Sequence, residues 1–168
     1  MAEKPLVSIV MGSDSDLEIM NEVGKALEGF GIPYEIDIAS AHRSPARTSE
    51  FARGAAARGV KVIVAGAGGA AHLAGVIAAE STLPVIGVPI PSTSLQGLDS
   101  LLSIVQMPAG IPVATVAIGK AGGTNAGILA AQIIALSDAG LAEKMKQHKQ
   151  KLAKGVEEKS AKLKASRK

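Results

Sequence analysis

The chain has 168 residues, which is the size of one ordinary domain and enough to bury a hydrophobic core. It has no cysteine, which excludes disulfides, thiolate metal sites and cysteine nucleophiles. Only two Phe and one Tyr are present, so we do not expect a module that stacks bases or flavins on aromatic rings. No apolar segment is long enough to span a bilayer and the first residues do not form a signal peptide. We therefore expect a cytoplasmic protein with no membrane partner.

The formal net charge of +3 is spread unevenly along the chain. Residues 142–168 hold ten Lys or Arg and three Glu, a net charge of +7, whereas residues 1–141 hold eight basic and twelve acidic groups, a net charge of −4. We therefore expect an α/β domain over residues 1–140 that carries any active site, and a basic C-terminal helix and tail over residues 141–168. An acidic body does not favour nucleic-acid binding, which needs a basic face on the folded domain.

Short apolar runs with β-branched residues predict buried strands, and apolar residues at helical spacing between these runs predict helices. In chain order the predicted elements are a strand over Leu6–Met11, a helix over residues 17–29, a strand over Tyr34–Ala39, a helix over residues 45–59, a strand over Val60–Ala65, a helix over Leu73–Ser81, a strand over Pro84–Val88, a helix over Leu95–Val105, a strand over Val113–Ile118, a helix over Gly127–Leu136 and a helix over Leu141–Lys164.

Two of these helices have unusual compositions. The segment Gly127–Leu136 is apolar on nearly all sides, which implies burial against more than one neighbour. Leu141–Lys164 is rich in Lys and Ala with a partial apolar stripe, and we expect it to be solvated, packed on a neighbouring subunit at its start and frayed at its end. Because strands and helices alternate, the fold class is predicted to be α/β, a doubly wound three-layer α/β/α sandwich around a parallel sheet.

Ligands of open parallel sheets bind beyond the carboxyl ends of the strands, and three loops with unusual chemistry leave those ends. The first is the loop Gly12–Asp16, which places hydroxyls and carboxylates at a helix N-terminus. Such an end favours an anion, with Ser13 as an added donor, and Asp16 can hold ribose hydroxyls. The alternative is that Ser13 to Asp16 only cap the helix.

The second loop, Ser40–Pro45, pairs a titratable group with a permanent cation. Arg43 can hold a phosphate or carboxylate with two hydrogen bonds, and a histidine such as His42 titrates near neutral pH. The alternative is a histidine bonded to the backbone beside an arginine that faces water. The position of the loop and its Gly-rich neighbour favour a functional role, with His42 as the group that moves protons.

The third loop, Gly66–His72, resembles a dinucleotide fingerprint without completing it. Gly66 and Gly68 are present, but Ala71 stands where the third glycine belongs, and no acidic residue is placed to hold a ribose. NAD binding is therefore disfavoured. The glycines instead indicate a nest of backbone amides around an anionic group, and the alternative is close helix–strand packing.

Two later segments, residues 103–112 and 119–125, have the composition of rigid loops, and the first could cover a pocket. The sequence has no HExxH motif, no GxSxG motif of a serine hydrolase and no GxxxxGK[ST] loop for ATP. Two histidines without a carboxylate cluster also make a poor metal site. The expected chemistry is therefore proton transfer and electrostatics, with neither metal nor cofactor.

The loops resemble one family, the catalytic subunit of phosphoribosylaminoimidazole carboxylase, including the bacterial N5-carboxyaminoimidazole ribonucleotide mutases. The matching segments are residues 11–16, 40–45, 65–73, 98–108 and 117–125. The resemblance implies a flavodoxin-like fold, a homo-octamer, no cofactor, and the isomerisation of N5-carboxyaminoimidazole ribonucleotide to 4-carboxy-5-aminoimidazole ribonucleotide in purine biosynthesis.

The resemblance also assigns roles to the loops. His42 would act first as general acid and then as general base. Ser13, Asp16, Ser40 and Arg43 would bind the phosphate and ribose of the substrate, while Gly68, Gly69 and His72 would line the site of the carboxylate and of carbon dioxide. The His-Arg pair resembles the mutase branch, because the branch that uses free carbon dioxide usually has His-Lys there.

Three alternatives remain open. Direct carboxylation of aminoimidazole ribonucleotide by carbon dioxide would use the same site. A non-catalytic nucleotide-binding module would keep Ser13, Asp16 and Arg43 without needing His42. A dinucleotide-dependent oxidoreductase is disfavoured by Ala71 and by the missing acidic residue.

Overall fold

A five-stranded parallel sheet forms the centre of the computed structural model, which describes residues 4–167. The strands are β1 (Val7–Met11), β2 (Tyr34–Ile38), β3 (Val62–Gly68), β4 (Val85–Ile90) and β5 (Ala114–Thr115). They lie in the order β2-β1-β3-β4-β5, and every neighbouring pair is parallel. This is the flavodoxin-like strand order, in which the chain reverses direction across the sheet next to β1.

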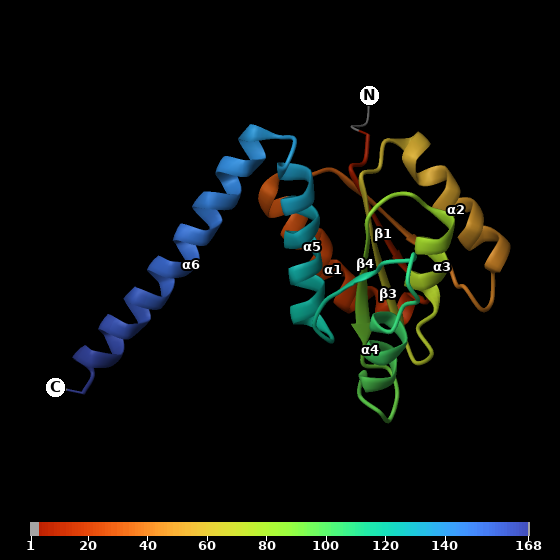
Figure 1. The fold of residues 1–168 in the computed structure, drawn as a ribbon. Helices are drawn as coiled ribbons and strands as arrows, with labels where there is room; N and C mark the ends of the chain where they lie inside the picture. The colour runs from red at the N-terminus through yellow and green to blue at the C-terminus, as the bar shows by residue number, and fades with distance from the viewer. Residues whose placement is uncertain (1–3, 168) are drawn as a thin grey trace.

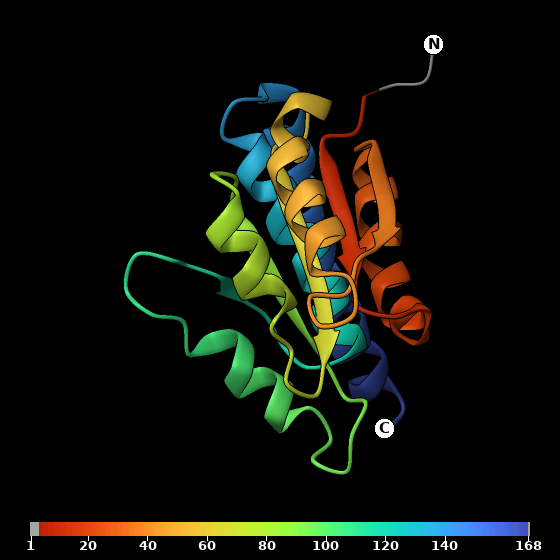
Figure 2. The same ribbon diagram turned by 90° about the vertical axis from the view of Figure 1, so that its right-hand side faces the viewer.

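Helices cover both faces of the sheet (Figures 1 and 2). They are the short 3₁₀ helix η1 (Asp14–Asp16), α1 (Leu17–Phe30), α2 (Pro45–Arg58), α3 (Leu73–Glu80), α4 (Leu98–Val105), α5 (Lys120–Ala135) and α6 (Ala139–Ala165). Side chains of α1 and α5 share one hydrophobic cluster with the sheet, and those of α2, α3 and α4 share a second. The predicted three-layer α/β/α class is therefore confirmed.

The strand sequences explain the two clusters. Successive side chains of a strand point to opposite faces of the sheet, so a sheet covered on both sides needs continuously apolar strands. In β1, Ile9 belongs to the cluster under α1 and α5, whereas its neighbour Val10 belongs to the cluster under α2, α3 and α4. Every residue of β1 and β4 is buried.

Helix α5 begins at Lys120, seven residues before the predicted start at Gly127, so the prediction of a loop at residues 119–125 was wrong for most of that segment. The reason is its contact with α1. A Cβ atom on Gly123 would lie 2.6 Å from the carbonyl oxygen of Ile19, and one on Gly127 would lie 2.7 Å from the carbonyl oxygen of Val23. The glycines that suggested a turn instead let two helix backbones approach closely.

Three other boundaries differ from the prediction by three residues, and the rest differ by two residues or fewer. Strand β3 continues to Gly68, so it includes the first residues of the predicted third loop. Helix α4 begins at Leu98 because Gln96 and Gly97 have φ angles of +55° and +90°, which end any helix that would start at Leu95. At the sheet edge only Ala114 and Thr115 pair with β4, so β5 is much shorter than Val113–Ile118.

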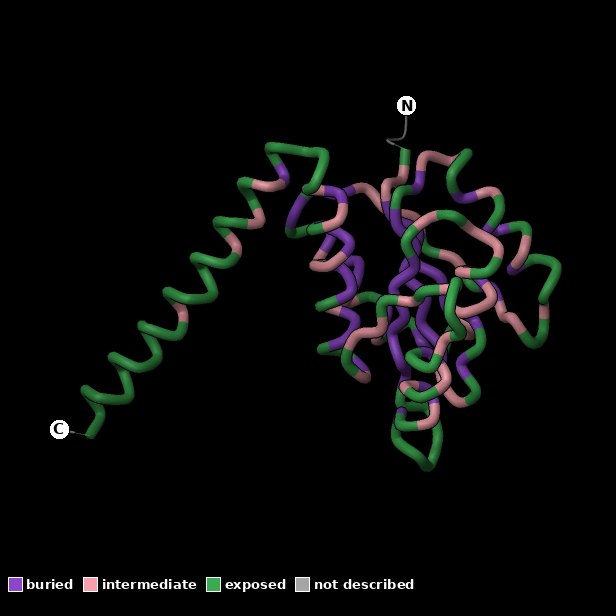
Figure 3. The backbone as a smooth tube through the Cα atoms, in the orientation of Figure 1, coloured by how far each residue is buried: buried purple, intermediate pink, exposed green. Residues whose placement is uncertain are grey.

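Helix α6 leaves the body of the molecule after its first turns (Figures 1 and 3). The side chain of Asp138 caps it by accepting a hydrogen bond from the backbone N–H of Leu141 at 2.9 Å. Leu141 is buried against the α1/α5 cluster, while nearly all later residues of α6 are exposed. Among residues 4–167, no helix combines the length and apolar character needed to cross a bilayer.

Candidate active site

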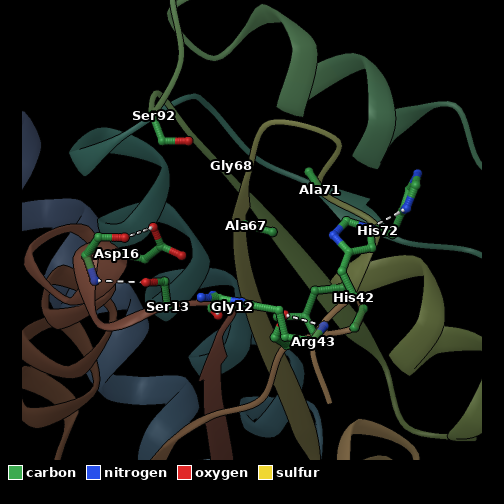
Figure 4. A pocket seen from close by; sticks show the side chains of 14 residues that line it. Gly12, Ser13, Asp16, His42, Arg43, Ala67, Gly68, Ala71, His72 and Ser92 are labelled. Atoms are coloured by element: carbon green, nitrogen blue, oxygen red, sulfur yellow. Dashed lines mark hydrogen bonds between the residues drawn. The ribbon is translucent and has the colours of Figure 1, made fainter. Parts of the chain in front are cut away.

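A pocket of about 310 Å³ opens at the carboxyl ends of the central strands, where the three predicted loops meet (Figure 4). Its lining residues come from the segments that follow β1, β2 and β4 and from the end of β3 through the start of α3, and they are Gly12, Ser13, Ser15, Asp16, Ser40, Ala41, His42, Arg43, Ala67, Gly68, Ala71, His72, Leu73 and Ser92. The loops converge because parallel strands end at the same edge of the sheet.

The loop after β1 caps a helix and also faces the pocket. The hydroxyl oxygen of Ser13 accepts a hydrogen bond from the backbone N–H of Ser15 at 3.4 Å, as the capping alternative predicted. Asp16 lies at the end of η1 and is only 5% exposed, although it lines the pocket. Burial raises the pKa of the Asp16 carboxyl, while the hydrogen bond from Ser15 and the charge of Arg43 act in the opposite direction.

Arg43 ties the loop after β2 to the loop after β1. One terminal nitrogen, Nη2, donates a hydrogen bond to the carbonyl oxygen of Gly12 at 2.7 Å. The hydroxyl oxygen of Ser40 accepts from the backbone N–H of Arg43 at 3.1 Å and from its Nε at 3.4 Å. The guanidinium has donors beyond these, so it can hold an anion while its orientation is fixed by Gly12 and Ser40.

The two histidines of the pocket contact one another although 30 residues separate them. Nε2 of His42 lies 2.7 Å from Nδ1 of His72, and the two rings meet edge to face with centroids 4.8 Å apart. At this distance one nitrogen donates a proton and the other accepts it, so the pair shares a single proton on this axis. Figure 4 shows both rings at the rim of the pocket.

The loop after β3 is tightly constrained. The backbone N–H of Ala71 donates to the carbonyl oxygen of Gly68 at 3.1 Å, which closes a turn through Gly69 with a φ angle of +60°. Ala71 itself has a φ angle of +37°, a conformation that is unfavourable for any residue with a Cβ atom. The turn directs His72, the residue before α3, toward His42.

Packing explains the glycines of this loop. A Cβ atom on Gly66 would lie 2.2 Å from Sδ of Met20 in α1, and one on Gly68 would lie 1.9 Å from the hydroxyl oxygen of Ser92. Close packing, the alternative to an amide nest, therefore accounts for Gly66. Gly68 faces the pocket as well, so its missing side chain both admits Ser92 and leaves room for a ligand.

The structure brings together seven of the eight predicted site residues as lining: Ser13, Asp16, Ser40, His42, Arg43, Gly68 and His72. Gly69 does not line the pocket and acts only through the turn. Among the described residues, segments 103–112 and 119–125 add nothing to the lining. Met107 of the first segment instead packs on α3, where its Sδ lies 3.1 Å from the position of a Cβ on Gly75.

Ser92 is the lining residue that sequence reasoning missed. It follows the fourth strand by two residues, so the rule that sites gather at carboxyl strand ends could have found it. The uniformly apolar segment before it gave no chemical signal. Within residues 4–167, no group of three or more His, Asp or Glu side chains is placed to share a metal ion.

Comparison with known proteins places this site in a family. The model of the AIR carboxylase family matches residues 6–155. The chain is 57% identical over 162 residues to the N5-carboxyaminoimidazole ribonucleotide mutase of Pyrococcus horikoshii, a match that covers 96% of this chain and 90% of that protein. It is 54% identical over 160 residues to the mutase of the same name from Bacillus subtilis, covering 95% and 99% of the two chains.

Two further comparisons extend the match. The chain is 52% identical over 160 residues to part of the Candida glabrata phosphoribosylaminoimidazole carboxylase, covering 95% of this chain and 28% of that protein. The crystal structure of Treponema denticola PurE superposes with a TM-score of 0.86 at 33% identity, covering 95% of this chain and 98% of the other. The chain belongs to the AIR carboxylase family.

Proposed function

We propose that this chain converts N5-carboxyaminoimidazole ribonucleotide into 4-carboxy-5-aminoimidazole ribonucleotide, as an isomerase of purine biosynthesis that needs no cofactor. The observation that carries the proposal is the pairing of His42 with His72 on the rim of a pocket that also contains Arg43. A histidine that can donate a proton and a guanidinium that can bind an anion therefore line the same pocket. Relatives at 57% and 54% identity carry the name of the mutase.

The ribonucleotide would lie with its phosphate and its base at opposite ends of the pocket. Ser13 and Arg43 would bind the phosphate, since a helix N-terminus and a guanidinium both favour an anion. Asp16 and Ser40 would complete the ribose and phosphate contacts. Gly68 and the turn through Gly69 to His72 would receive the carboxylate, which places the migrating group beside His42.

The reaction needs one proton to be delivered and one to be removed. When the bond between N5 and the carboxylate carbon breaks, its electron pair stays on nitrogen, and protonated His42 supplies a proton to that nitrogen as carbon dioxide leaves. The ring carbon then forms a bond to the trapped carbon dioxide. Neutral His42 removes the proton from that ring carbon, which restores both the aromatic ring and the protonated histidine.

His72 supports this cycle by its position. When Nε2 of His42 donates to Nδ1 of His72, the other nitrogen of His42 is free to face the substrate. The contact also fixes the ring orientation, as partners of catalytic histidines do. We assign His72 to the lining of the carboxylate site and to holding His42, and His42 alone to proton transfer.

The proposal includes the assembly and the compartment. We infer that the chain works as a homo-octamer in the cytoplasm with a small ribonucleotide as substrate. Exposed apolar side chains on α4 support association between copies, since Leu98, Leu102 and Val105 are 53%, 49% and 48% exposed on a single chain.

Turnover of N5-carboxyaminoimidazole ribonucleotide without ATP, metal or added bicarbonate tests the proposal. We expect wild type to convert it and His42→Asn to lose roughly 100- to 10,000-fold in kcat or more, because the missing step is proton transfer. Arg43→Ala should raise KM instead, since it removes a charge-assisted contact. The matched controls His148→Asn and Arg53→Ala lie outside the pocket and should keep both constants.

Other results would assign a different function. If the wild-type protein does not convert N5-carboxyaminoimidazole ribonucleotide but carboxylates aminoimidazole ribonucleotide in concentrated bicarbonate, the protein is a direct carboxylase. Wild type that binds the nucleotide without converting it would show a binding module. Equal, modest losses in the His42 and Arg43 variants would contradict the roles given to them.

A further inference from the structure

Ser92 is held over the pocket by a rigid segment at the end of β4. Its backbone N–H donates to the carbonyl oxygen of Ile90 at 3.0 Å, which closes a three-residue turn across Pro91. The ring of Pro91 fixes its φ angle, and two other segments pack against this residue. A Cβ atom on Gly97 would lie 3.3 Å from Cα of Pro91, and one on Gly119 would lie 3.8 Å from its Cγ. Packing around Pro91 therefore fixes the position of Ser92.

The hydroxyl of Ser92 lies over Gly68, the first residue of the tight turn after β3. A Cβ atom on Gly68 would lie 1.9 Å from the hydroxyl oxygen of Ser92, so this oxygen occupies the space of a missing side chain. Thr93 covers the next residue of the turn, because its Cγ2 lies 3.7 Å from the position of a Cβ on Gly69. Figure 4 shows Ser92 beside Gly68 and away from Arg43. The loop after β4 thus covers the end of the pocket proposed for the substrate carboxylate.

The hydroxyl of Ser92 differs from the other serine hydroxyls of the pocket. Ser13 and Ser15 donate to neighbouring aspartates at 3.0 and 3.3 Å, and Ser40 accepts twice from Arg43. Of the four serines that line the pocket, Ser92 is the one whose hydroxyl has no hydrogen-bond partner within residues 4–167. Its donor and its acceptor positions are therefore both available to a ligand.

The neighbouring hydroxyl, that of Thr93, is already used to fix the loop. It donates to Oδ2 of Asp99 at 2.6 Å and accepts from the backbone N–H of Leu95 at 3.2 Å. The hydrogen bond from Thr93 also lowers the pKa of the Asp99 carboxyl, which keeps this acceptor ionised at neutral pH. Of the two hydroxyls that cover the turn after β3, that of Ser92 is therefore the one that can meet a substrate.

We propose that Ser92 is a substrate-binding residue that donates a hydrogen bond to the migrating carboxylate, an inference that rests on the proposed function. In the bound carbamate the acceptor is a carboxylate oxygen, so the bond is charge-assisted. When the bond between N5 and the carboxylate carbon breaks, its electron pair stays on nitrogen and His42 supplies the proton. Carbon dioxide is then released beside Gly68. Ser92 closes the pocket over that molecule until the ring carbon bonds to it.

The affinities of two nucleotides test the hydrogen bond. 4-Carboxy-5-aminoimidazole ribonucleotide has the carboxylate, and aminoimidazole ribonucleotide lacks it. We expect Ser92→Ala to raise the Kd of the first roughly 10-fold or more, the usual size of a hydrogen bond to a charged group, and to leave the Kd of the second unchanged. Its Tm should equal that of wild type, because the hydroxyl that is removed has no partner in the fold.

Ser94→Ala is the matched control for these measurements. Ser94 stands in the same loop but does not line the pocket, so its loss should change neither Kd. Equal increases of both Kd values in Ser92→Ala would show a general distortion of the pocket and overturn the proposal. An unchanged Kd for the carboxylated nucleotide would overturn it as well.

Retention of the migrating carbon tests the closure over carbon dioxide. N5-carboxyaminoimidazole ribonucleotide labelled with 13C in its carboxylate is converted in unlabelled bicarbonate, and an enzyme-free sample measures the spontaneous exchange. We expect wild type and Ser94→Ala to keep the label in the product. Ser92→Ala should lose more of it, because carbon dioxide escapes before the ring carbon bonds to it. Equal retention in Ser92→Ala and wild type overturns the closure.

Failure of the proposed function would give a different pattern. A wild type that itself loses the label, or that binds both nucleotides without converting them, contradicts the mutase reaction. The two Kd values are measured without turnover, so in either case they still decide whether Ser92 contacts the carboxylate.

Discussion

Gly68→Ala tests whether the pocket is shaped by the contact between the loops after β3 and β4. The added Cβ would lie 1.9 Å from the hydroxyl oxygen of Ser92, 2.9 Å from its Cβ and 3.2 Å from the carbonyl oxygen of Ile90. Carbon atoms in good contact lie about 3.5–4.0 Å apart. The serine hydroxyl can rotate away, but its Cβ and the Ile90 carbonyl can move only with the backbone.

The magnitude follows from this geometry. Overpacking of a well-packed site costs about 1–3 kcal/mol, which lowers the Tm of a domain of this size by roughly 2–4 °C per kcal/mol. A displacement of the lining by about 1 Å can cost on the order of 100-fold in turnover. We therefore expect Gly68→Ala to lose both stability and activity.

A double-mutant cycle isolates the contact. Ser92→Gly removes both serine atoms that the new Cβ would strike, so the double variant Gly68→Ala, Ser92→Gly should recover most of the lost free energy of unfolding. The cycle is measured by chemical denaturation of the four proteins and by turnover. A coupling free energy within about 0.5 kcal/mol of zero would refute the argument, because additive effects mean that the two positions do not touch.

Two other predictions concern buried charge and helix packing. Asp16→Asn should raise the free energy of unfolding at pH 7, because burial raises the pKa of this carboxyl and its ionised form therefore destabilises the fold. The gain should shrink as the pH falls through the raised pKa and vanish below the ordinary value of 3.8, and a gain that persists in acid would contradict this cause. Gly123→Ala should lower the free energy of unfolding by about 1–3 kcal/mol, since its Cβ would lie 2.6 Å from the carbonyl oxygen of Ile19. Gly29→Ala in α1 is the control, because no atom lies within 4 Å of the added Cβ, and it should raise the free energy of unfolding by roughly 0.5–1 kcal/mol. Equal effects of the two alanine substitutions in denaturant titrations would disprove the packing argument.

The fold class and most of the site could be read from local patterns. A sheet covered on both faces demands continuously apolar strands, and β1 and β4 have that composition. The loops with Ser13, His42 and Arg43 could be grouped from the order of strands and helices alone, because parallel strands end at one edge.

Boundaries that depend on tertiary contacts could not be predicted in this way. Local turn chemistry makes Gly122-Gly123 a loop signal, but both residues are helical, and the close approach of the α1 backbone explains the glycine at position 123. The length of β5 depended on how much of Val113–Ile118 could pair with β4, which no local pattern encodes.

Periodicity and side-chain chemistry were enough to predict the layers, the edge of the sheet where the chemistry lies, and the residue types that could move a proton or hold an anion. Three other facts came only from the folded chain. His72 contacts His42, Ser92 completes the lining of the pocket, and the apolar stripe of α6 is buried at its start and exposed further along the helix. Those facts join residues far apart in the chain, and their distances are set by packing of the whole fold.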